Sequence, residues 1–120
     1  MSADPVFTTG GSGIGVFKSA AASNKRAIGV DQDQYQSVGD PSLQPVIMTS
    51  VLKRVDLAVG TFIDEYVDGS IEGGEDILND LSTGGIELAT SGGFIDDIQD
   101  QIDEYRQKII DGEIEVPQAE

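Results

Sequence analysis

The chain has 120 residues, of which 22 are acidic and 7 are basic, so its net charge is −15 at pH 7. It contains no histidine and no cysteine, which excludes the commonest general base, every disulfide and every thiolate-ligated metal site. A surface this acidic repels phosphate backbones and argues against nucleic acid as a partner. The acids alternate with apolar residues, which predicts a folded domain with acidic solvent faces, as is typical of proteins that work in high salt.

The first half of the chain alternates between strand-like and helix-like segments. Three short apolar runs predict strands at residues 6–9, 26–30 and 46–50. A glycine-rich turn over 10–15 leads into a predicted helix over 16–23, and a polar segment over 31–45 with two prolines predicts a loop. Strands that alternate with helices indicate the α/β class, with the first strands parallel.

The second half predicts two amphipathic helices with a hairpin between them. The first helix carries apolar residues at steps of three and four, namely Leu52, Val55, Val59, Phe62 and Tyr66. The last helix repeats the pattern with Ile95, Ile98, Ile102, Tyr105 and Ile109. Gly69 and Gly112 mark their ends. Between them, segments 76–82 and 85–90 flank a Thr-Gly-Gly turn, which predicts a β-hairpin.

The glycines of "GGSGIGVFKS" do not match the sequence signature of a nucleotide loop. A P-loop requires Gly-Lys-Ser/Thr, whereas Gly15 is followed by Val16. A Rossmann fingerprint that starts at Gly11 requires a third glycine at position 16, which is valine. The stretch therefore predicts a tight strand-to-helix turn, whose backbone N–H groups can also approach a ligand.

Asp31 comes directly after the predicted second strand. Ligands of open α/β sheets lie beyond the carboxyl ends of the strands, where a carboxylate can accept hydrogen bonds from two vicinal hydroxyls of a sugar. The alternative is a solvated loop acid in a very acidic chain. Asp31 and Asp33 match an EF-hand calcium loop only weakly, because an EF-hand would place Asp or Asn where the chain has Tyr35.

Lys53 and Arg54 stand side by side in a chain with 7 basic residues. We expect Lys53 to start a helix with Ser50 as its N-cap, where the helix dipole disfavours a cation. A base in such a place indicates either a bound partner or a salt bridge to a nearby acid. No Ser/His/Asp or Cys/His set is possible in this composition, so a catalytic function has almost no support.

Four segments taken in order carry a family resemblance: "ADPVFTTGGSGIGVFKSA", "RAIGVDQDQY", "VIMTSVLKRVDLAVGTFIDEYVDG" and "IDDIQDQIDEYRQKIIDGEIEVP". They resemble the C-terminal part of the basic membrane protein family, the lipoprotein solute-binding components of ABC transporters, whose best-known members are purine-nucleoside receptors. The most specific element is Gly-Val-Asp-x-Asp-Gln followed by Thr-Ser-x-x-Lys-Arg-Val-Asp. The glycine loop departs mildly, with "TTGGSG" where the family has Ala-Ala-Gly-Gly-Thr-Gly.

The resemblance implies a Rossmann-like lobe of a type I periplasmic-binding-protein fold, incomplete because only the C-terminal portion is present. Residues 1–120 would be the C-terminal portion of a two-lobed solute-binding protein, without the first half, the signal peptide or the lipid-attachment cysteine. The helix that follows Lys53 would return to the opposite lobe. An incomplete sheet has open edges and exposed apolar stripes, so we expect a homo-oligomer.

The resemblance also implies the site residues. Asp31 matches the acid that binds the ribose hydroxyls, and Lys53 matches the lysine that reaches the same sugar. Gly10 and Gly11 match the turn that faces the ligand cleft. Phe7 would offer an aromatic face to a purine, although core packing would explain Phe7 equally well. No cofactor, metal or catalytic residue is implied.

The function implied is nucleoside binding by an extracytoplasmic, lipid-anchored protein that works with an ABC permease, although this chain carries no targeting signal. One alternative is a cytoplasmic sensory domain of the same fold that binds a small molecule to control a partner. The other is a fragment that binds nothing, because the missing half carried most of the affinity.

Overall fold

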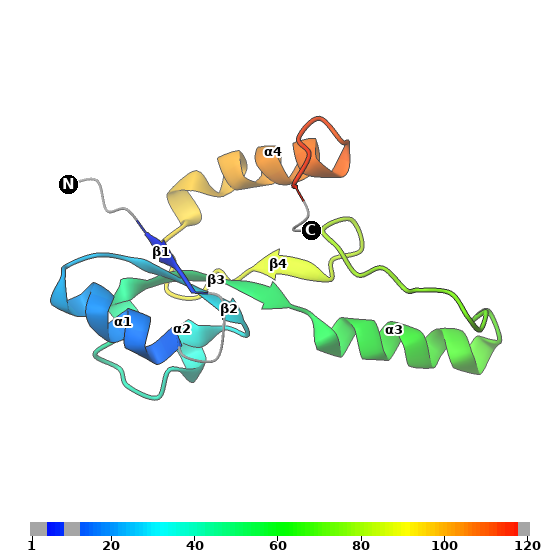
Figure 1. The fold of residues 1–120 in the computed structure, drawn as a ribbon, viewed down its shortest axis with the longest axis horizontal. Coiled ribbons are helices and arrows are strands. Elements are labelled where there is room, and N and C mark those ends of the chain that lie inside the picture. The colour runs from blue at the N-terminus through cyan, green and yellow to red at the C-terminus, as the bar shows by residue number, and fades with distance from the viewer. Residues whose placement is uncertain (1–4, 9–12, 118–120) are drawn as a thin grey trace.

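The computed structural model describes residues 5–8 and 13–117. Four strands form one sheet in the order β1-β2-β3-β4 (Figure 1). The strands are β1 (Val6–Phe7), β2 (Ala27–Asp31), β3 (Ile47–Lys53) and β4 (Ile86–Leu88). The first three are parallel, and β4 runs antiparallel to β3. The predicted α/β class with parallel first strands is therefore confirmed.

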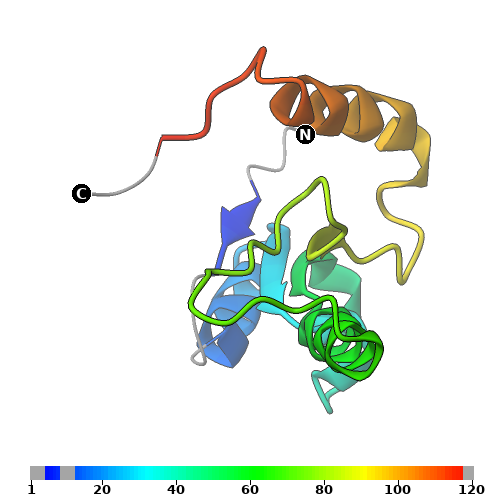
Figure 2. The same ribbon diagram turned by 90° about the vertical axis from the view of Figure 1, so that its right-hand side faces the viewer.

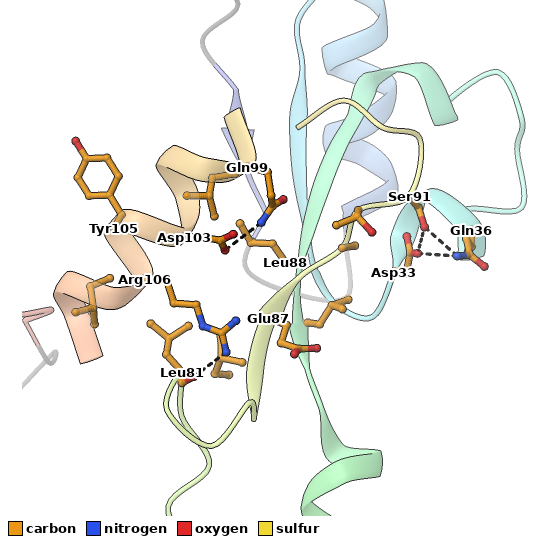
Figure 3. A pocket seen from close by; sticks show the side chains of 16 residues that line it. Asp33, Gln36, Leu81, Glu87, Leu88, Ser91, Gln99, Asp103, Tyr105 and Arg106 are labelled. Atoms are coloured by element: carbon orange, nitrogen blue, oxygen red, sulfur yellow. Dashed lines mark hydrogen bonds between the residues drawn. The ribbon is translucent and has the colours of Figure 1, made fainter. Parts of the chain in front are cut away.

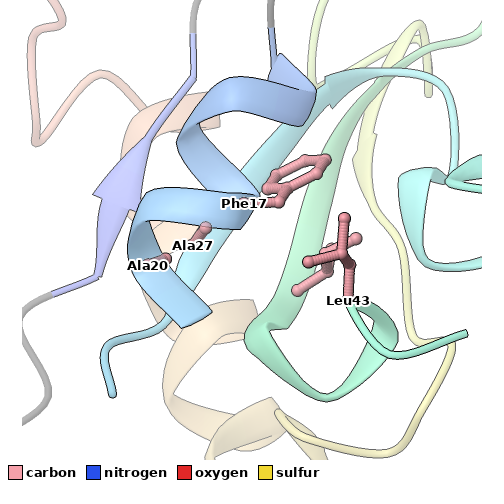
Figure 4. Packing of buried hydrophobic residues seen from close by; sticks show 5 residues of the cluster. Phe17, Ala20, Ala27 and Leu43 are labelled. Carbon is pink, nitrogen blue, oxygen red and sulfur yellow. The ribbon is translucent and has the colours of Figure 1, made fainter. Parts of the chain in front are cut away.

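Helix α1 (Gly13–Ala22) covers one face of the sheet and supplies the core. Phe17 is 1% exposed and lies one turn from Ala20, so both side chains face β2 and β3. There they pack against Ala27, Ile47 and Leu43 (Figure 4). The alanine run favours a helix because alanine has the best helix propensity, and its small side chains let the helix approach the sheet closely.

The region predicted as one loop, residues 31–45, contains two short helices. These are α2 (Gln34–Ser37) and the single 3₁₀ turn η1 (Gln44–Val46). The Gln44 side chain donates a hydrogen bond to the carbonyl of Tyr35 at 3.0 Å, which ties the two turns together. The prediction of a continuous loop was therefore wrong. The segment has no apolar periodicity that would have indicated these two short helices.

Strand β3 continues to Lys53, beyond the predicted end at residue 50, and α3 (Val55–Asp68) begins where the strand has ended. Leu52 pairs with Asp31 on one side and with Glu87 on the other. Backbone partners on both sides keep this segment extended, so the expectation that Lys53 starts a helix was wrong. The predicted helix end is confirmed, since Gly69 adopts a left-handed φ of 79° at the C-cap.

The predicted hairpin is also absent, because residues 76–82 form turns and irregular backbone and β4 pairs with β3 instead. The cause lies at Asp80, whose carboxylate accepts hydrogen bonds from the backbone N–H groups of Ser82 and Thr83. Such local side-chain bonds compete with the ladder that a strand would need. Of the three apolar residues of the segment, Ile77 and Leu78 are exposed and Leu81 is half-buried.

The last helix, α4 (Gln99–Ile110), lies over the face of the sheet opposite α1 and α2 (Figures 1 and 2). A 3₁₀ turn, η2 (Asp96–Ile98), leads into it, so the helix begins four residues later than its apolar periodicity predicted. Gly112 follows with a positive φ of 74°. Within residues 5–8 and 13–117, no helix is long and apolar enough to cross a membrane.

Candidate functional site

Polar residues gather where the parallel strands end. Asp31 is the last residue of β2, Lys53 is the last residue of β3, and Thr8 follows β1. Because β1, β2 and β3 are parallel, their carboxyl ends share one edge of the sheet. That edge is where ligands of open α/β sheets bind, and we take it as the candidate site.

The structure brings Asp31 and Lys53 together. The Lys53 Nζ lies 2.8 Å from a carboxylate oxygen of Asp31, and the two side chains are 61% and 53% exposed, respectively. An ion pair this exposed contributes little to stability. The contact uses one of the two carboxylate oxygens and one of three ammonium donors. The pair therefore offers both acceptors and donors to a solute at this edge.

The position of Lys53 corrects the sequence interpretation. It ends strand β3 rather than starting a helix, and Arg54 occupies the N-cap position of α3. Ser50 is not a cap either. It is fully buried, and its hydroxyl accepts a hydrogen bond from the backbone N–H of Gln34 at 3.1 Å.

Arg54 has an internal structural role. Its guanidinium donates hydrogen bonds to both carboxylate oxygens of Asp56 and, at 2.7 Å, to Glu87 on β4. The hydrogen bonds from Arg54 lower the pKa of Asp56 to about 2. The same contacts raise the pKa of Arg54. Arg54 thus ties the start of α3 to strand β4. The salt bridge to a nearby acid that we gave as one alternative for Lys53 is its contact with Asp31.

The structure does not bring Phe7, the other predicted ligand-binding residue that it describes, to the Asp31–Lys53 pair. Gly10 and Gly11 lie outside the described residues. Phe7 is 48% exposed on β1, the edge strand, and is separated from Lys53 by β2. Gly13 and Gly15, which we expected in a turn, belong to α1, so the helix begins three residues before its predicted start at residue 16.

A second polar cluster was not found from the sequence. Asp33 accepts hydrogen bonds from the side chains of Gln36, at 2.9 Å, and Ser91 (Figure 3). Ser91 lies 58 residues away in the sequence, and nothing in its neighbourhood pointed to Asp33. The other carboxylate oxygen of Asp33 is buried and has no hydrogen-bond partner among the described residues.

This cluster borders an open cavity of about 740 Å³ between α4, β4 and the end of β3. Its lining is mostly apolar, and Arg106 of α4 spans one side by donating a hydrogen bond to the carbonyl of Leu81 at 3.0 Å (Figure 3). Asp31 and Lys53 do not line it, although their neighbours Asp33 and Leu52 do. The cavity and the Asp31–Lys53 edge are therefore adjacent but separate features.

Across the part of the chain that the structure describes, no group of three or more acidic side chains is arranged to hold a metal ion. The arrangement at the strand ends is instead a paired acceptor and donor, which suits a polar organic solute better than a cation.

Comparison with known proteins identifies the family. The family described as "ABC transporter substrate-binding protein PnrA-like" matches residues 3–120. A CD4+ T-cell-stimulating antigen of Listeria innocua is 34% identical over 96% of this chain and 36% of its own length. The ABC transporter nucleoside-binding protein BmpA of Lactococcus lactis is 34% identical over 90% of this chain and 34% of its own length. The chain thus spans about a third of the length of these relatives. The family consists of binding proteins rather than enzymes, which agrees with the absence of a catalytic set in the sequence. The chain belongs to the PnrA-like family of ABC transporter substrate-binding proteins.

Proposed function

We propose that this chain is the ligand-binding C-terminal part of an ABC transporter substrate-binding lipoprotein whose solute is a nucleoside. The observation that carries the proposal is the Asp31–Lys53 pair at the carboxyl edge of the parallel strands. The name of the Lactococcus lactis relative, a nucleoside-binding protein, supports the choice of solute.

The chemistry of the pair suits a ribose. Two vicinal hydroxyls present two donors, and the two oxygens of the Asp31 carboxylate can accept both. Lys53 is held against Asp31 at 2.8 Å and can donate to an oxygen of the same sugar. Hydrogen bonds to charged groups contribute more than neutral ones, about 1.5–3 kcal/mol each. Two of them would distinguish a ribose from a sugar that lacks the hydroxyls.

The base would be recognised separately. We assign Phe7 to the aromatic face that stacks on a purine, because its ring is half-exposed on the edge strand. Gly10 and Gly11 would let the backbone approach the solute without a side chain between them. In this scheme the sugar contacts Asp31 and Lys53, and the base extends toward β1.

The relatives set the wider context of the proposal. Residues 1–120 would form the C-terminal portion of a two-lobed protein, lipid-anchored outside the cytoplasm, which delivers its solute to an ABC permease. The family match and the share of the relatives' length that is covered support this arrangement. The net charge of −15 supports a protein adapted to high salt.

We further propose that the chain associates with a second copy through α3. This helix extends away from the sheet (Figure 1) and buries none of its residues fully. Its exposed apolar side chains are Val55, Leu57, Val59, Phe62, Ile63, Tyr66 and Val67. An apolar surface of this kind is typical of a protein–protein contact.

Calorimetry tests the nucleoside assignment. The chain is titrated with adenosine, guanosine, inosine, uridine and cytidine, and at least one should bind. Asp31→Ala should then weaken binding by about 2–4 kcal/mol, as expected for two charge-assisted hydrogen bonds. Asp97→Ala is the matched control, since Asp97 is an exposed acid in the 3₁₀ turn before α4 and its loss changes the net charge equally. No binding of any nucleoside, or equal effects of the two variants, would contradict the proposal.

A further inference from the structure

Asp31 lies in an unusual backbone conformation. Its φ is +71°, one of two positive values among the described non-glycine residues. The N–H of Gln32 donates to the carbonyl of Val30 at 2.9 Å, which closes a three-residue turn centred on Asp31. A turn of this kind with a positive central φ is rare and strained. Such strain persists only where the surrounding structure holds it in place.

The group that holds this turn is Gln34. Its side-chain oxygen accepts a hydrogen bond from the N–H of Val30 at 2.9 Å, and its own backbone N–H donates to the buried hydroxyl of Ser50 at 3.1 Å. β1 pairs with β2 only as far as Ile28. The Gln34 side chain therefore supplies an acceptor to Val30 beyond the end of that ladder.

Close contacts with β2 and β3 fix the position of the Gln34 side chain. A Cβ at Gly29 would lie 2.6 Å from the Gln34 side-chain oxygen and 2.5 Å from the Ser50 hydroxyl. Only a glycine at position 29 admits the amide against the backbone of β2. Gly29 and Ser50, which are buried, and Gln34, which is half-buried, thus meet behind the turn, while Asp31 faces outward to Lys53.

We propose that Gln34 is a positioning residue for Asp31, which holds the left-handed turn so that the carboxylate meets Lys53 and the nucleoside. The part of this inference that concerns the nucleoside rests on the proposed function. The part that concerns the turn rests only on the contacts described above. Without the Gln34 acceptor, the Val30 N–H loses its partner and the strained turn relaxes toward extended backbone. The Asp31 side chain then turns away from Lys53, since successive residues of a strand point to opposite faces.

The turn is tested without any ligand. NMR scalar couplings and chemical shifts report the φ of Asp31 in isotope-labelled protein. Gln34→Leu, which keeps the size of the side chain and removes the acceptor, should shift Asp31 from left-handed to extended values. Gln34→Glu keeps an oxygen for Val30 and should restore the left-handed values. Gln32→Leu is the matched control on the exposed side of the turn and should change nothing.

A milder variant guards against misfolding. Ser50→Ala loosens Gln34 without removing its side chain, and it should move the Asp31 couplings in the same direction as Gln34→Leu. Left-handed values of Asp31 retained in both variants would overturn the inference, whatever the chain binds.

The second readout is inosine affinity, with any other bound nucleoside as a substitute. Gln34→Leu should weaken binding about tenfold in the native background and should have no further effect in an Asp31→Ala background, because Gln34 acts through Asp31. Equal losses in both backgrounds would overturn the positioning role. If Asp31→Ala itself leaves affinity unchanged while the couplings behave as expected, the proposed function fails and the control of the turn by Gln34 stands.

Discussion

Replacing Gly29 by alanine should destabilise the fold sharply, although the change adds a single methyl group. The new Cβ would lie 2.5 Å from the Ser50 hydroxyl and 2.6 Å from the Gln34 side-chain oxygen, both shorter than any tolerated contact. Overpacking of this kind costs about 1–3 kcal/mol. Displacing Gln34 also weakens its two hydrogen bonds, each worth about 1 kcal/mol, and the partial loss of both adds about 1 kcal/mol. We expect a total loss of roughly 2–4 kcal/mol.

Thermal unfolding monitored by circular dichroism measures this loss. For a domain of this size, it corresponds to a decrease of about 10 °C in melting temperature. Gly15→Ala is the matched control, because a Cβ there meets nothing within 4 Å and the position is helical. Alanine at position 15 should raise stability by about 0.5–1 kcal/mol. A Gly29→Ala protein as stable as the parent would refute the packing described around Gln34.

Three further predictions concern charge and association. The pKa of Asp56 is lowered to about 2 by Arg54, so this carboxylate stabilises the folded state above its unfolded pKa of about 3.9, and the contribution is lost as pH falls from about 4 to about 2. Arg54→Gln should return the Asp56 pKa toward its ordinary value in an NMR titration, and an unchanged titration would contradict the contact. Because 22 acids face 7 bases, the melting temperature should rise between low and molar potassium chloride, and a flat or falling value would remove the high-salt interpretation. Sedimentation should show a dimer or larger species that Phe62→Glu converts to monomer, whereas a monomeric parent protein would exclude association through α3.

The parallel part of the fold was predictable because its signals are local. Short apolar runs separated by a helix-like alanine segment predict β1 and β2, a third apolar run predicts β3, and the α/β class follows from their order. The end of β3 was not predictable. Leu52 and Val55 fit a helical period as well as a strand, and pairing with β2 and β4 decides between them. The prediction of a hairpin was wrong for a similar reason. The hydrogen bonds to the Asp80 carboxylate compete with strand pairing in a segment that is only weakly apolar.

The sequence predicted which residues belong to the candidate site better than it predicted how they contact one another. Asp31 stands out from the sequence because it follows a buried strand, and the family resemblance pairs it with Lys53. Their contact at 2.8 Å depends on the register of β2 and β3, which the sequence does not state. The left-handed turn at Asp31 could not be predicted, since aspartate tolerates a positive φ but does not require one. The contribution of Ser91 depends on a contact across 58 residues.

The most direct measurement of the central claim compares inosine with 2′,3′-dideoxyinosine, each titrated into the parent chain and into Asp31→Ala. If Asp31 accepts the ribose hydroxyls, removing those hydroxyls should weaken binding to the parent by about 2–4 kcal/mol. The same removal should have almost no effect in Asp31→Ala, because the acceptor is already gone. Equal affinities of the two nucleosides for the parent chain, or an equal difference in both proteins, would contradict the assignment of Asp31 to the sugar.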